Sequence, residues 1–490
     1  MGAMKQKETK SEKSLMVNSI FSSAYKLLNV LFPLISATYL ARILAPEGIG
    51  KIAYAQNIVS YFLLLATLGI PYYGIREIAK CRGNLQEKSK IFSELLIINL
   101  LSTVCAVVAY CAVILLLFPS NIQLYLVCGL ELLFNVINID WLYEGDEEYV
   151  YITIRSSILK LLALAALFVL VRGPEDYILY ALIHALGICG NYLLNIANAH
   201  KKVRLRLQGL NIKRHINSIL VLMLSTVMGS LYNKIDITML GWMSGDAAVG
   251  WYTNAHKVIG LVLTLVVSVS AVFLPRLSYV YSTDRKKFAE YTTIGLKAVL
   301  ILAIPGCMGI LITAPNMMST LFGGEFLPGA TTLRILAVFT VIRGAGDLLC
   351  YQAIISSGNE SKLVLARMVA SVANIVLNAA FIPRYGHNGA AMASVISELI
   401  VNGMLLPLAL RITKPTISWK FLISVLVGTG LMAVVAMAVQ HLLGYGTLSM
   451  IVTVVAGIGA YCLGLLLTKN ELLIQAKGFL VKPKNTEGQE

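Results

Sequence analysis

The sequence predicts an all-α membrane protein with about fourteen transmembrane helices, arranged as two six-helix lobes followed by two extra C-terminal helices. Three observations lead to this fold class. They are a strongly apolar composition, a series of apolar stretches long enough to cross a bilayer, and an internal repeat at an offset of about 200 residues.

The composition indicates the solvent in which the helices lie. Of the 490 residues, 57% are hydrophobic and only 13% are charged, and the mean hydropathy is +0.76. A soluble domain is about 45–50% apolar and about 25% charged. We therefore expect this chain to cross a membrane many times.

The apolar stretches give the predicted spans, since crossing about 30 Å of hydrocarbon takes roughly 20 residues. The first stretch is followed by no A-x-A site before the next turn, so we expect it to remain as a helix and not to be cleaved as a signal. The expected spans are 15–41, 49–72, 91–118, 121–142, 151–171, 176–198, 216–242, 249–275, 291–318, 330–352, 363–383, 389–410, 417–441 and 447–468.

The repeat relates residues 35–76 to residues 235–276 without a gap. We place its paired glycines at a turn, its alanines on the helix that follows and its arginines at the far end of that helix. Six helices separate the copies, so both enter the membrane in the same direction, which predicts a pseudo-two-fold axis along the membrane normal with a cleft on it. The paired residues are Ile35 and Ile235, Thr38 and Thr238, Gly50 and Gly250, Ala55 and Ala255, and Arg76 and Arg276.

The net charge of +15 comes from basic residues that fall in every second connection. Roughly 29 of them lie on one side and about four on the other, so the positive-inside rule places both termini in the cytoplasm and argues against nucleic acid as a partner. Only the connection 144–148 is acidic. The expected divisions are a tail (1–14), the N-lobe (15–200), a basic linker (201–215), the C-lobe (216–411), helices 13 and 14 (412–468) and a second tail (469–490).

Motifs for catalysis or nucleotide binding are not found in the sequence. It contains no GxxxxGK[ST], HExxH or GxSxG pattern, and its eight cysteines show neither paired spacing nor CxxC. We therefore expect a transporter and not an enzyme, with no cofactor and no metal site.

Polar residues mark the helix faces that we expect to line the cleft. On span 216–242 they occupy about half of the circumference, with Asp236 and Lys234 at opposite edges of that arc. On span 249–275 they form one narrow stripe that includes Lys257. The repeat offset places Lys26 at the centre of the first arc and Asn57 opposite Lys257. Asn29, Asn57, Asn233 and Thr264 are the predicted polar lining.

Ionisable side chains inside a membrane cost at least about 2.5 kcal/mol each, so they need a partner or a role. Lys26 and Lys257 have no carboxylate one turn away, whereas Arg343 and Asp347 are spaced to neutralise each other. Lys160 and Lys297 either snorkel to an interface or face the cleft. The cationic candidates for substrate binding are Lys26, Lys234, Lys257 and Arg343, and the candidates for ion coupling are Glu131, Asp236 and Glu398.

A cleft with more cations than anions suits an anionic cargo. A diphosphate gains about 4 kcal/mol per close charge pair at an effective dielectric of 20. An inside-negative potential also favours outward movement of an anion by about 2.3 kcal/mol per charge per 100 mV.

Four segments resemble the Wzx-type polysaccharide flippases, whose superfamily also holds the multidrug MATE exporters and the lipid II flippases. They are residues 14–80, with the run ATYLARILAPEGIGKIAYAQ, and WLYEGDEEYVYITIRS, LGWMSGDAAVGWYTNAHKV and FIPRYGHNGAAMASVISEL. The resemblance implies a MATE-like fold. It also implies translocation of undecaprenyl-diphosphate-linked oligosaccharide repeat units from the inner to the outer leaflet of a bacterial cytoplasmic membrane, by alternating access.

Family members rely on cationic residues in the central cavity, and Lys26, Lys234, Lys257 and Arg343 match by location and charge. The partners implied are the lipid-linked oligosaccharide, membrane lipids, H⁺ or Na⁺ and the polysaccharide polymerase machinery, with a functional monomer. Three alternatives stay open: a MATE-like cation-coupled antiporter of small molecules, a lipid II-type flippase, and a non-transporting scaffold or polymerase subunit.

Overall fold

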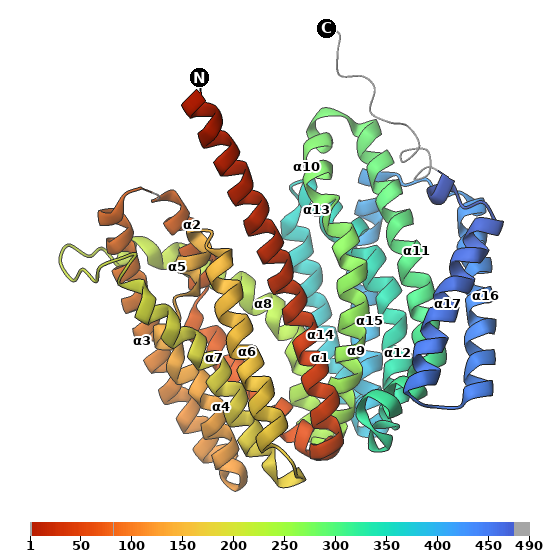
Figure 1. Ribbon diagram of the computed structural model, residues 1–490, viewed down its shortest axis with the longest axis horizontal. Coiled ribbons are helices and arrows are strands. Elements are labelled where there is room, and N and C mark those ends of the chain that lie inside the picture. The colour runs from red at the N-terminus through yellow and green to blue at the C-terminus, as the bar shows by residue number, and fades with distance from the viewer. Residues whose placement is uncertain (1, 82, 475–490) are drawn as a thin grey trace. The chain divides into compact units, whose positions relative to one another are not determined.

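A computed structural model describes the backbone of residues 2–81 and 83–474 and the side chains of residues 32–81, 83–224, 226–227 and 234–474. The described residues contain helices and no strand, which confirms the predicted all-α class (Figure 1). They divide into two compact units, Met1–Thr238 and Met239–Glu490.

Unit 1 contains seven complete α-helices and most of an eighth among the described residues. Its helices are α1 (Gly2–Thr67), α2 (Ile70–Lys80), α3 (Leu85–Leu117), α4 (Ile122–Phe134), α5 (Asp140–Gly145), α6 (Tyr149–Leu170), α7 (Tyr177–Ala199) and α8 (Lys213–Ser244), with 3₁₀ turns η1 (Pro119–Asn121), η2 (Asn135–Ile137) and η3 (Pro174–Asp176).

Unit 2 begins within the last turns of α8. Its helices are α9 (Asp246–Ala271), α10 (Leu274–Thr283), α11 (Arg285–Met317), α12 (Gly329–Gly346), α13 (Ala353–Ser356), α14 (Glu360–Tyr385), α15 (His387–Thr413), α16 (Trp419–Leu443) and α17 (Thr447–Leu467), with the π-helical turns η4 (Met318–Phe322) and η6 (Asp347–Gln352) and the 3₁₀ turn η5 (Gly324–Phe326).

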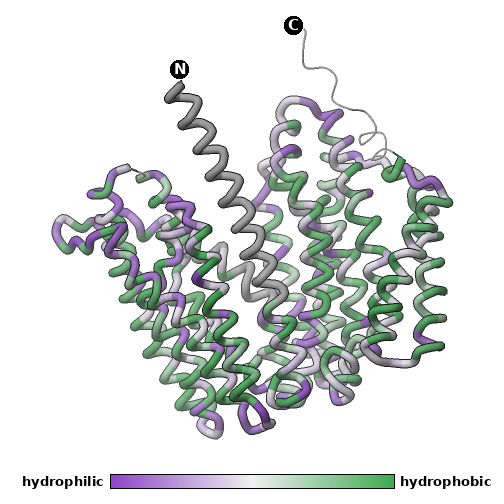
Figure 2. The backbone as a smooth tube through the Cα atoms, in the orientation of Figure 1, coloured by the Kyte–Doolittle hydropathy of each residue, from purple (hydrophilic) through white to green (hydrophobic). Residues whose placement is uncertain are grey.

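Each of the fourteen predicted spans lies mostly on helix, although some cross a break between two helices. Among the described residues, eleven helices are long and apolar enough to cross a membrane. One of these, Phe32–Lys80, joins two predicted spans across a kink, and the spans 216–242 and 330–352 lie on α8 and α12, which are not among the eleven. Figure 2 shows apolar residues along the bodies of the helices and polar residues at many of the connections.

The predicted span 121–142 is too long. Helix α4 ends at Phe134, and the chain continues through η2 to the separate helix α5. Ending a helix in an apolar environment leaves carbonyl groups without partners. Here the amide of Asn99 on α3 donates to the carbonyls of Asn135 and Val136 at 2.6 and 3.2 Å, so a distant residue stabilises the break.

The internal repeat is visible in local geometry. Helix α3 and helix α11 both have 33 residues, and their N-caps, Asn84 and Asp284, accept hydrogen bonds from the two amides that follow in the first turn. In α11, the backbone amides of Lys287 and then of Lys286 hold the pKa of Asp284 below its usual value. The hydroxyls of Thr38 and Thr238 each donate to the carbonyl four residues earlier.

The turn of the repeat differs from the one predicted. Ala45 and Gly245 carry the chain through it with φ values of 56° and 81°, and Gly50 and Gly250 lie beyond it inside the next helix. Ala45 has a ψ of 175°, which places an alanine in a region that is essentially open only to glycine.

Helices α2 and α5 pack together at one end of unit 1, where two glycines permit a close approach. A Cβ atom at Gly74 would lie 2.7 Å from the ring of Trp141, and one at Gly145 would lie 2.8 Å from Ile78. Trp141 and Ile78 belong to a buried apolar cluster that also includes Tyr143.

Helices α16 and α17 lie side by side at the edge of unit 2 and pack on α11 (Figure 1). The hydroxyl of Tyr461 donates to the carbonyl of Ile301 at 2.6 Å. Lys297, which the sequence left as either snorkelling or facing the cleft, bonds to Glu471 at 2.7 Å.

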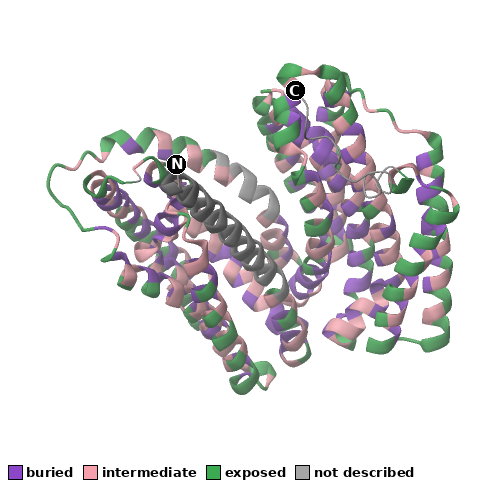
Figure 3. Cartoon of the chain, turned by 45° about the horizontal axis from the view of Figure 1, so that its top comes forward, coloured by how far each residue is buried: buried purple, intermediate pink, exposed green. Residues whose placement is uncertain are grey.

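Many residues on the outside of the helices are exposed (Figure 3). Large apolar residues are among them. Leu116 is 79% exposed and Leu448 is 69% exposed. Contiguous apolar surface of this kind is normal for a protein that faces lipid. The protein is therefore a multi-pass membrane protein.

Candidate functional site

Helix α9 presents a polar face on the surface of unit 2. Lys257, Thr264 and Ser268 are exposed along it, whereas Thr253 is buried. Thr264 and Ser268, with Arg343 of α12, line an open pocket of about 700 Å³. The predicted polar stripe therefore continues into a pocket that Arg343 also lines.

Lys257 is the cation nearest the start of this face. Its Nζ donates to the side-chain oxygen of Asn254 at 3.1 Å, and Asn254 is fully buried. Among the described residues, no carboxylate oxygen lies within 4.0 Å of the Lys257 ammonium. Its charge is therefore held in place by a neutral amide and not cancelled by an anion.

The sequence suggested that Arg343 pairs with Asp347, but Arg343 forms its ion pair with Glu398. Nη1 of Arg343 donates to both oxygens of Glu398 on α15, at 3.1 and 3.0 Å. The backbone N–H of Asp347 still bonds to the Arg343 carbonyl, so the i,i+4 register is kept, but the two side chains bond to different neighbouring helices. Asp347 instead accepts hydrogen bonds from Ser270 and from Gln352.

A second, smaller pocket of about 270 Å³ lies inside unit 2, between α12, η6, α14 and α15. Its charged lining consists of Arg343, Arg367, Asp347 and Glu398. The Arg367 guanidinium lies over the ring of Tyr351, 5.0 Å from its centre. The sequence analysis did not single out Arg367, although a charged residue within the expected span 363–383 was a visible signal.

The predicted site residues that lie in unit 1 mainly connect one helix to another. The Asn57 amide is buried and donates to the Lys234 carbonyl at 3.1 Å and to Thr238 Oγ1 at 2.7 Å, so it joins α1 to α8. Asp236 is only 5% exposed. Glu131 of α4 and Lys234 lie close enough for their charges to attract each other.

Three predicted site residues, Lys26, Asn29 and Asn233, have side chains outside the described residues. The structure therefore places Lys257, Thr264, Arg343 and Glu398 in or beside pockets of unit 2, and Asn57, Glu131, Lys234 and Asp236 in unit 1.

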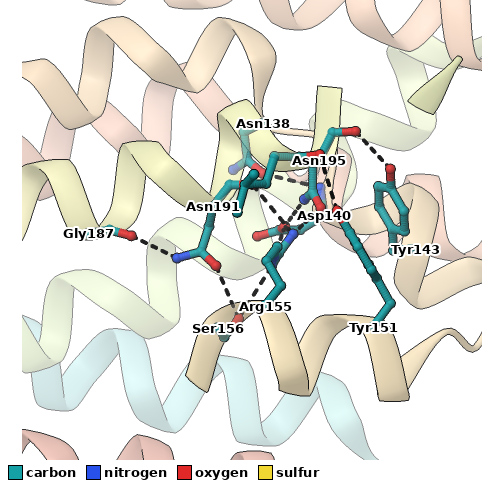
Figure 4. A network of polar contacts seen from close by, with 10 residues as sticks. Asn138, Asp140, Tyr143, Tyr151, Arg155, Ser156, Gly187, Asn191 and Asn195 are labelled. Carbon is teal, nitrogen blue, oxygen red and sulfur yellow. Dashed lines mark hydrogen bonds and ion pairs between the residues drawn. The ribbon is translucent and has the colours of Figure 1, made fainter. Parts of the chain in front are cut away.

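Unit 1 contains a buried polar network that sequence reasoning missed (Figure 4). Arg155 of α6 is 6% exposed, lies 3.3 Å from Asp140 of α5 and donates to Asn195 of α7. Asn191 accepts from Ser156 at 3.2 Å and donates to the Gly187 carbonyl at 2.8 Å. The network ties α5, α6 and α7 together.

The acidic connection 144–148 binds basic residues of its neighbours. Lys88 bonds to Asp146, with the closest atoms 2.5 Å apart, and Lys202 bonds to Glu148. Burial raises the pKa of Glu144, and the charge of Asp140 acts in the same direction. The exception to the basic pattern thus has a structural cause.

The basic linker is also fixed to unit 1. The Glu94 carboxylate is fully buried and accepts from Arg214 Nη2 at 2.6 Å, and it bonds to His215 Nε2 at 2.7 Å. The Tyr73 hydroxyl bonds to the other ring nitrogen of His215 at 2.7 Å.

Residues 15–280, more than half of the chain, match the family described as "Polysaccharide biosynthesis protein". The chain belongs to this family. The matched segment covers the helices of unit 1 and continues through α9 into α10, so it includes Lys257 and its polar face.

Similar proteins are named as transporters or flippases. A "Putative O-antigen transporter" of Shigella dysenteriae is 24% identical over 382 residues, which are 76% of this chain and 94% of that protein. Among solved structures, the fold resembles a lipid II flippase MurJ in an inward closed conformation, with a TM-score of 0.70, 18% identity and coverage of 91% of this chain and 97% of the other.

A multidrug resistance MATE family transporter in an inward-facing conformation gives a TM-score of 0.62 at 17% identity and covers 78% of this chain and 94% of the transporter. These likenesses confirm the predicted MATE-like fold.

Proposed function

We propose that this family member is a flippase for undecaprenyl-diphosphate-linked oligosaccharide repeat units. It moves them from the inner to the outer leaflet of a bacterial cytoplasmic membrane by alternating access of its two repeats. The observation that carries the proposal is the exposed polar face of α9, where Lys257 has no carboxylate partner among the described residues and where Arg343 helps to line an open pocket.

The charge of this face selects the cargo. The ionisable side chains on it and in its pocket are cationic, while the carboxylate of Glu398 lies behind Arg343 with its side chain only 3% exposed. A diphosphate bound near Lys257 and Arg343 finds two positive charges, and Thr264 and Ser268 offer hydroxyl groups to sugars. The isoprenoid tail stays in the bilayer because it is apolar.

A MATE-like antiporter of small cations is the alternative. Cationic cargo favours an acidic face, and the charges on the α9 face argue against it. The lipid II-type flippase remains closer, since its cargo is also a lipid-linked diphosphate, and the sugar specificity separates the two.

The proposal includes the setting of the protein. Both termini lie in the cytoplasm, and the polymerase machinery receives the flipped lipid. The inside-negative potential drives an anion outward. Glu131, Asp236 and Glu398 are the carboxylates that would carry H⁺ or Na⁺ if transport is ion-coupled, and Lys26 and Lys234 contribute to the cationic path.

The test is transport in liposomes. Purified protein is reconstituted, and outward movement of a fluorescent undecaprenyl-diphosphate-linked sugar is measured with and without an inside-negative potential. We expect transport that Lys257→Ala abolishes and Lys257→Arg retains. Lys286→Ala, which removes a cation from an exposed helix start elsewhere in unit 2, is the matched control. Equal rates in empty liposomes and in liposomes with protein would refute the proposal.

A further inference from the structure

Arg367 is a half-buried arginine of α14, and its guanidinium has no hydrogen-bond acceptor in the part of the chain that the structure describes. It lies over the ring of Tyr351, 5.0 Å from the ring centre. The hydroxyl of Tyr351 also has no hydrogen-bond partner among the described residues. A guanidinium carries five N–H donors and a phenol carries one O–H donor. Two neighbouring side chains therefore present hydrogen-bond donors that these residues leave without acceptors.

The carboxylates that line the same small pocket as Arg367 are bonded to other groups. They belong to Asp347 and Glu398. Glu398 forms an ion pair with Arg343, and Asp347 accepts a hydrogen bond from Ser270 of α9. No carboxylate oxygen of the described residues lies within 4.0 Å of the Arg367 guanidinium. Arg367 is thus a cation of this lining that forms no ion pair within the described ranges.

The position of Arg367 within a membrane helix makes this unusual. Helix α14 is long and apolar enough to cross a membrane. An arginine in such a helix is costly unless it meets an anion or reaches the interface. Stacking on Tyr351 compensates only part of that cost. A phosphate group would compensate more, because two guanidinium N–H groups can donate to two of its oxygens at once.

The surroundings of Arg367 on α14 indicate contact with lipid. Val364, Leu365 and Met368 are exposed and apolar, as expected for a helix face turned toward acyl chains. From Glu360, where α14 begins, the helix rises about 10 Å to Arg367. The predicted topology places that helix start on the cytoplasmic side. The long side chain can therefore extend to the phosphate level of the inner leaflet.

The pocket along α9, to which the proposed function assigns the substrate, has a different lining. It contains the hydroxyls of Thr264 and Ser268, which suit sugars, and it does not include Arg367. The lining around Arg367 contains no serine or threonine, and its uncharged part includes Leu363 and Leu405. Arg343 lines both pockets. A ligand with one phosphate and acyl chains matches the lining around Arg367 better than a diphosphate with several sugars.

We propose that Arg367 and Tyr351 bind the phosphate of an anionic membrane phospholipid of the phosphatidylglycerol type in the inner leaflet. The guanidinium donates to two phosphate oxygens, and the Tyr351 hydroxyl donates to a third oxygen of the headgroup. The acyl chains lie along Val364 and Met368. A headgroup with a net negative charge is favoured because no second cation accompanies its phosphate. This lipid is not the transported one, so the inference goes beyond the proposed function and does not rest on it.

The experiment counts lipids bound to the purified full-length protein by native mass spectrometry. Wild type should retain dioleoylphosphatidylglycerol more tightly than dioleoylglycerol, which has the same chains and no phosphate. Arg367→Gln should weaken the tightest phosphatidylglycerol binding by about tenfold to a hundredfold, and Tyr351→Phe by about twofold to tenfold. Arg367→Lys should fall between wild type and Arg367→Gln, because it keeps the charge and loses the paired donors. Lys362→Gln, which removes an exposed cation from the same helix, is the control and should have no effect.

Three results would overturn the lipid site. The first is a folded Arg367→Gln protein that retains phosphatidylglycerol like wild type. The second is wild-type protein that binds dioleoylglycerol as tightly as dioleoylphosphatidylglycerol, which decides the question even if the variants fail to fold. The third is displacement of the tightest phosphatidylglycerol by an equal concentration of farnesyl diphosphate, which would assign Arg367 to the path of the substrate. Flipping by wild type in liposomes is measured separately, so each of these results leaves the proposed function standing.

Discussion

Both carboxylate oxygens of Glu398 accept hydrogen bonds from the same guanidinium nitrogen of Arg343, which lies on a neighbouring helix. Removing one partner of a buried ion pair usually costs about 3–5 kcal/mol. Arg343→Gln should therefore lower the free energy of unfolding, and Arg343→Gln/Glu398→Gln should lower it by about 0.5–3 kcal/mol less than the sum of the two single variants, because it removes both charges of the pair.

Thermal unfolding of the two single variants and the double variant checks this expectation. Strict additivity would mean that the Arg343–Glu398 pair has no net effect on stability. Lys362→Gln combined with Arg343→Gln serves as the control pair and should be additive, since Lys362 is exposed.

Lys257 should be required for export but not for folding. Lys257 is exposed, and among the described residues it donates to the neutral side chain of Asn254 and pairs with no carboxylate, so its loss leaves none of them without a counter-ion. In a strain that depends on this protein, Lys257→Ala should stop surface polysaccharide export at an unchanged protein level. Lys26→Ala is predicted to do the same. Normal export from both variants would remove these lysines from the mechanism.

The turn of the repeat gives a prediction about stability. Ala45 has a φ of 56° and a ψ of 175°, a conformation that costs about 1–3 kcal/mol for a residue other than glycine. Ala45→Gly should therefore stabilise the protein by about 1 kcal/mol, even after the added flexibility of the unfolded chain is subtracted.

The opposite substitution, at the matching position of the second repeat, is the control for Ala45→Gly. Gly245→Ala should destabilise by a similar amount, and a Cβ atom there meets no other atom within 4 Å, so the effect is one of backbone conformation alone. A melting temperature that moves in the same direction for both variants would contradict this explanation.

The ion pair between Lys88 and Asp146 should contribute measurably to stability. Each side chain is only 14% exposed, so water screens the pair less than a surface pair. Asp146→Asn should lower the free energy of unfolding by about 1–3 kcal/mol. The charge-exchanged variant Lys88→Asp/Asp146→Lys should recover part of that loss, and a double variant no better than Lys88→Asp alone would show that the pair has no net effect.

The bonds of Glu471 predict that the stability of the packing of α16 and α17 depends on pH. Hydrogen bonds from Lys297 and then from Ser418 hold the pKa of Glu471 below its usual value. A lowered pKa in the folded protein means that the stabilisation is complete above the unfolded pKa, about 4.3, and is lost as the pH falls through the folded value. Glu471→Gln should melt at a lower temperature than wild type at neutral pH, and the difference should vanish in acid. A difference that persists in acid would exclude this cause.

The fold was largely predictable because crossing a bilayer imposes a length and a polarity on each helix. The repeat was also correctly found, since the N-caps Asn84 and Asp284 repeat with it. The end of α4 was not predictable. It depends on Asn99, a residue of α3 whose amide satisfies the carbonyls that the break exposes.

The charged residues of the site were found by their type, but their partners were not. Sequence spacing suggested that Arg343 pairs with Asp347, yet each bonds to another helix, Arg343 to Glu398 of α15 and Asp347 to Ser270 of α9. The Arg155 network was missed for the same reason, because it joins residues of three helices. Pairing between helices is decided in three dimensions, and one sequence carries little information about it.

Asp347, Glu398 and Asn402 have the same spacing along the chain as Asp140, Asn191 and Asn195 of the Arg155 network. The copy in unit 1 carries a neutral amide at the middle position, and its arginine is buried. The copy in unit 2 carries Glu398 there, bonded to an arginine that lines an open pocket. Duplication can thus keep one architecture in both halves of the chain while a single exchange of amide for acid gives one half a charge that the other lacks.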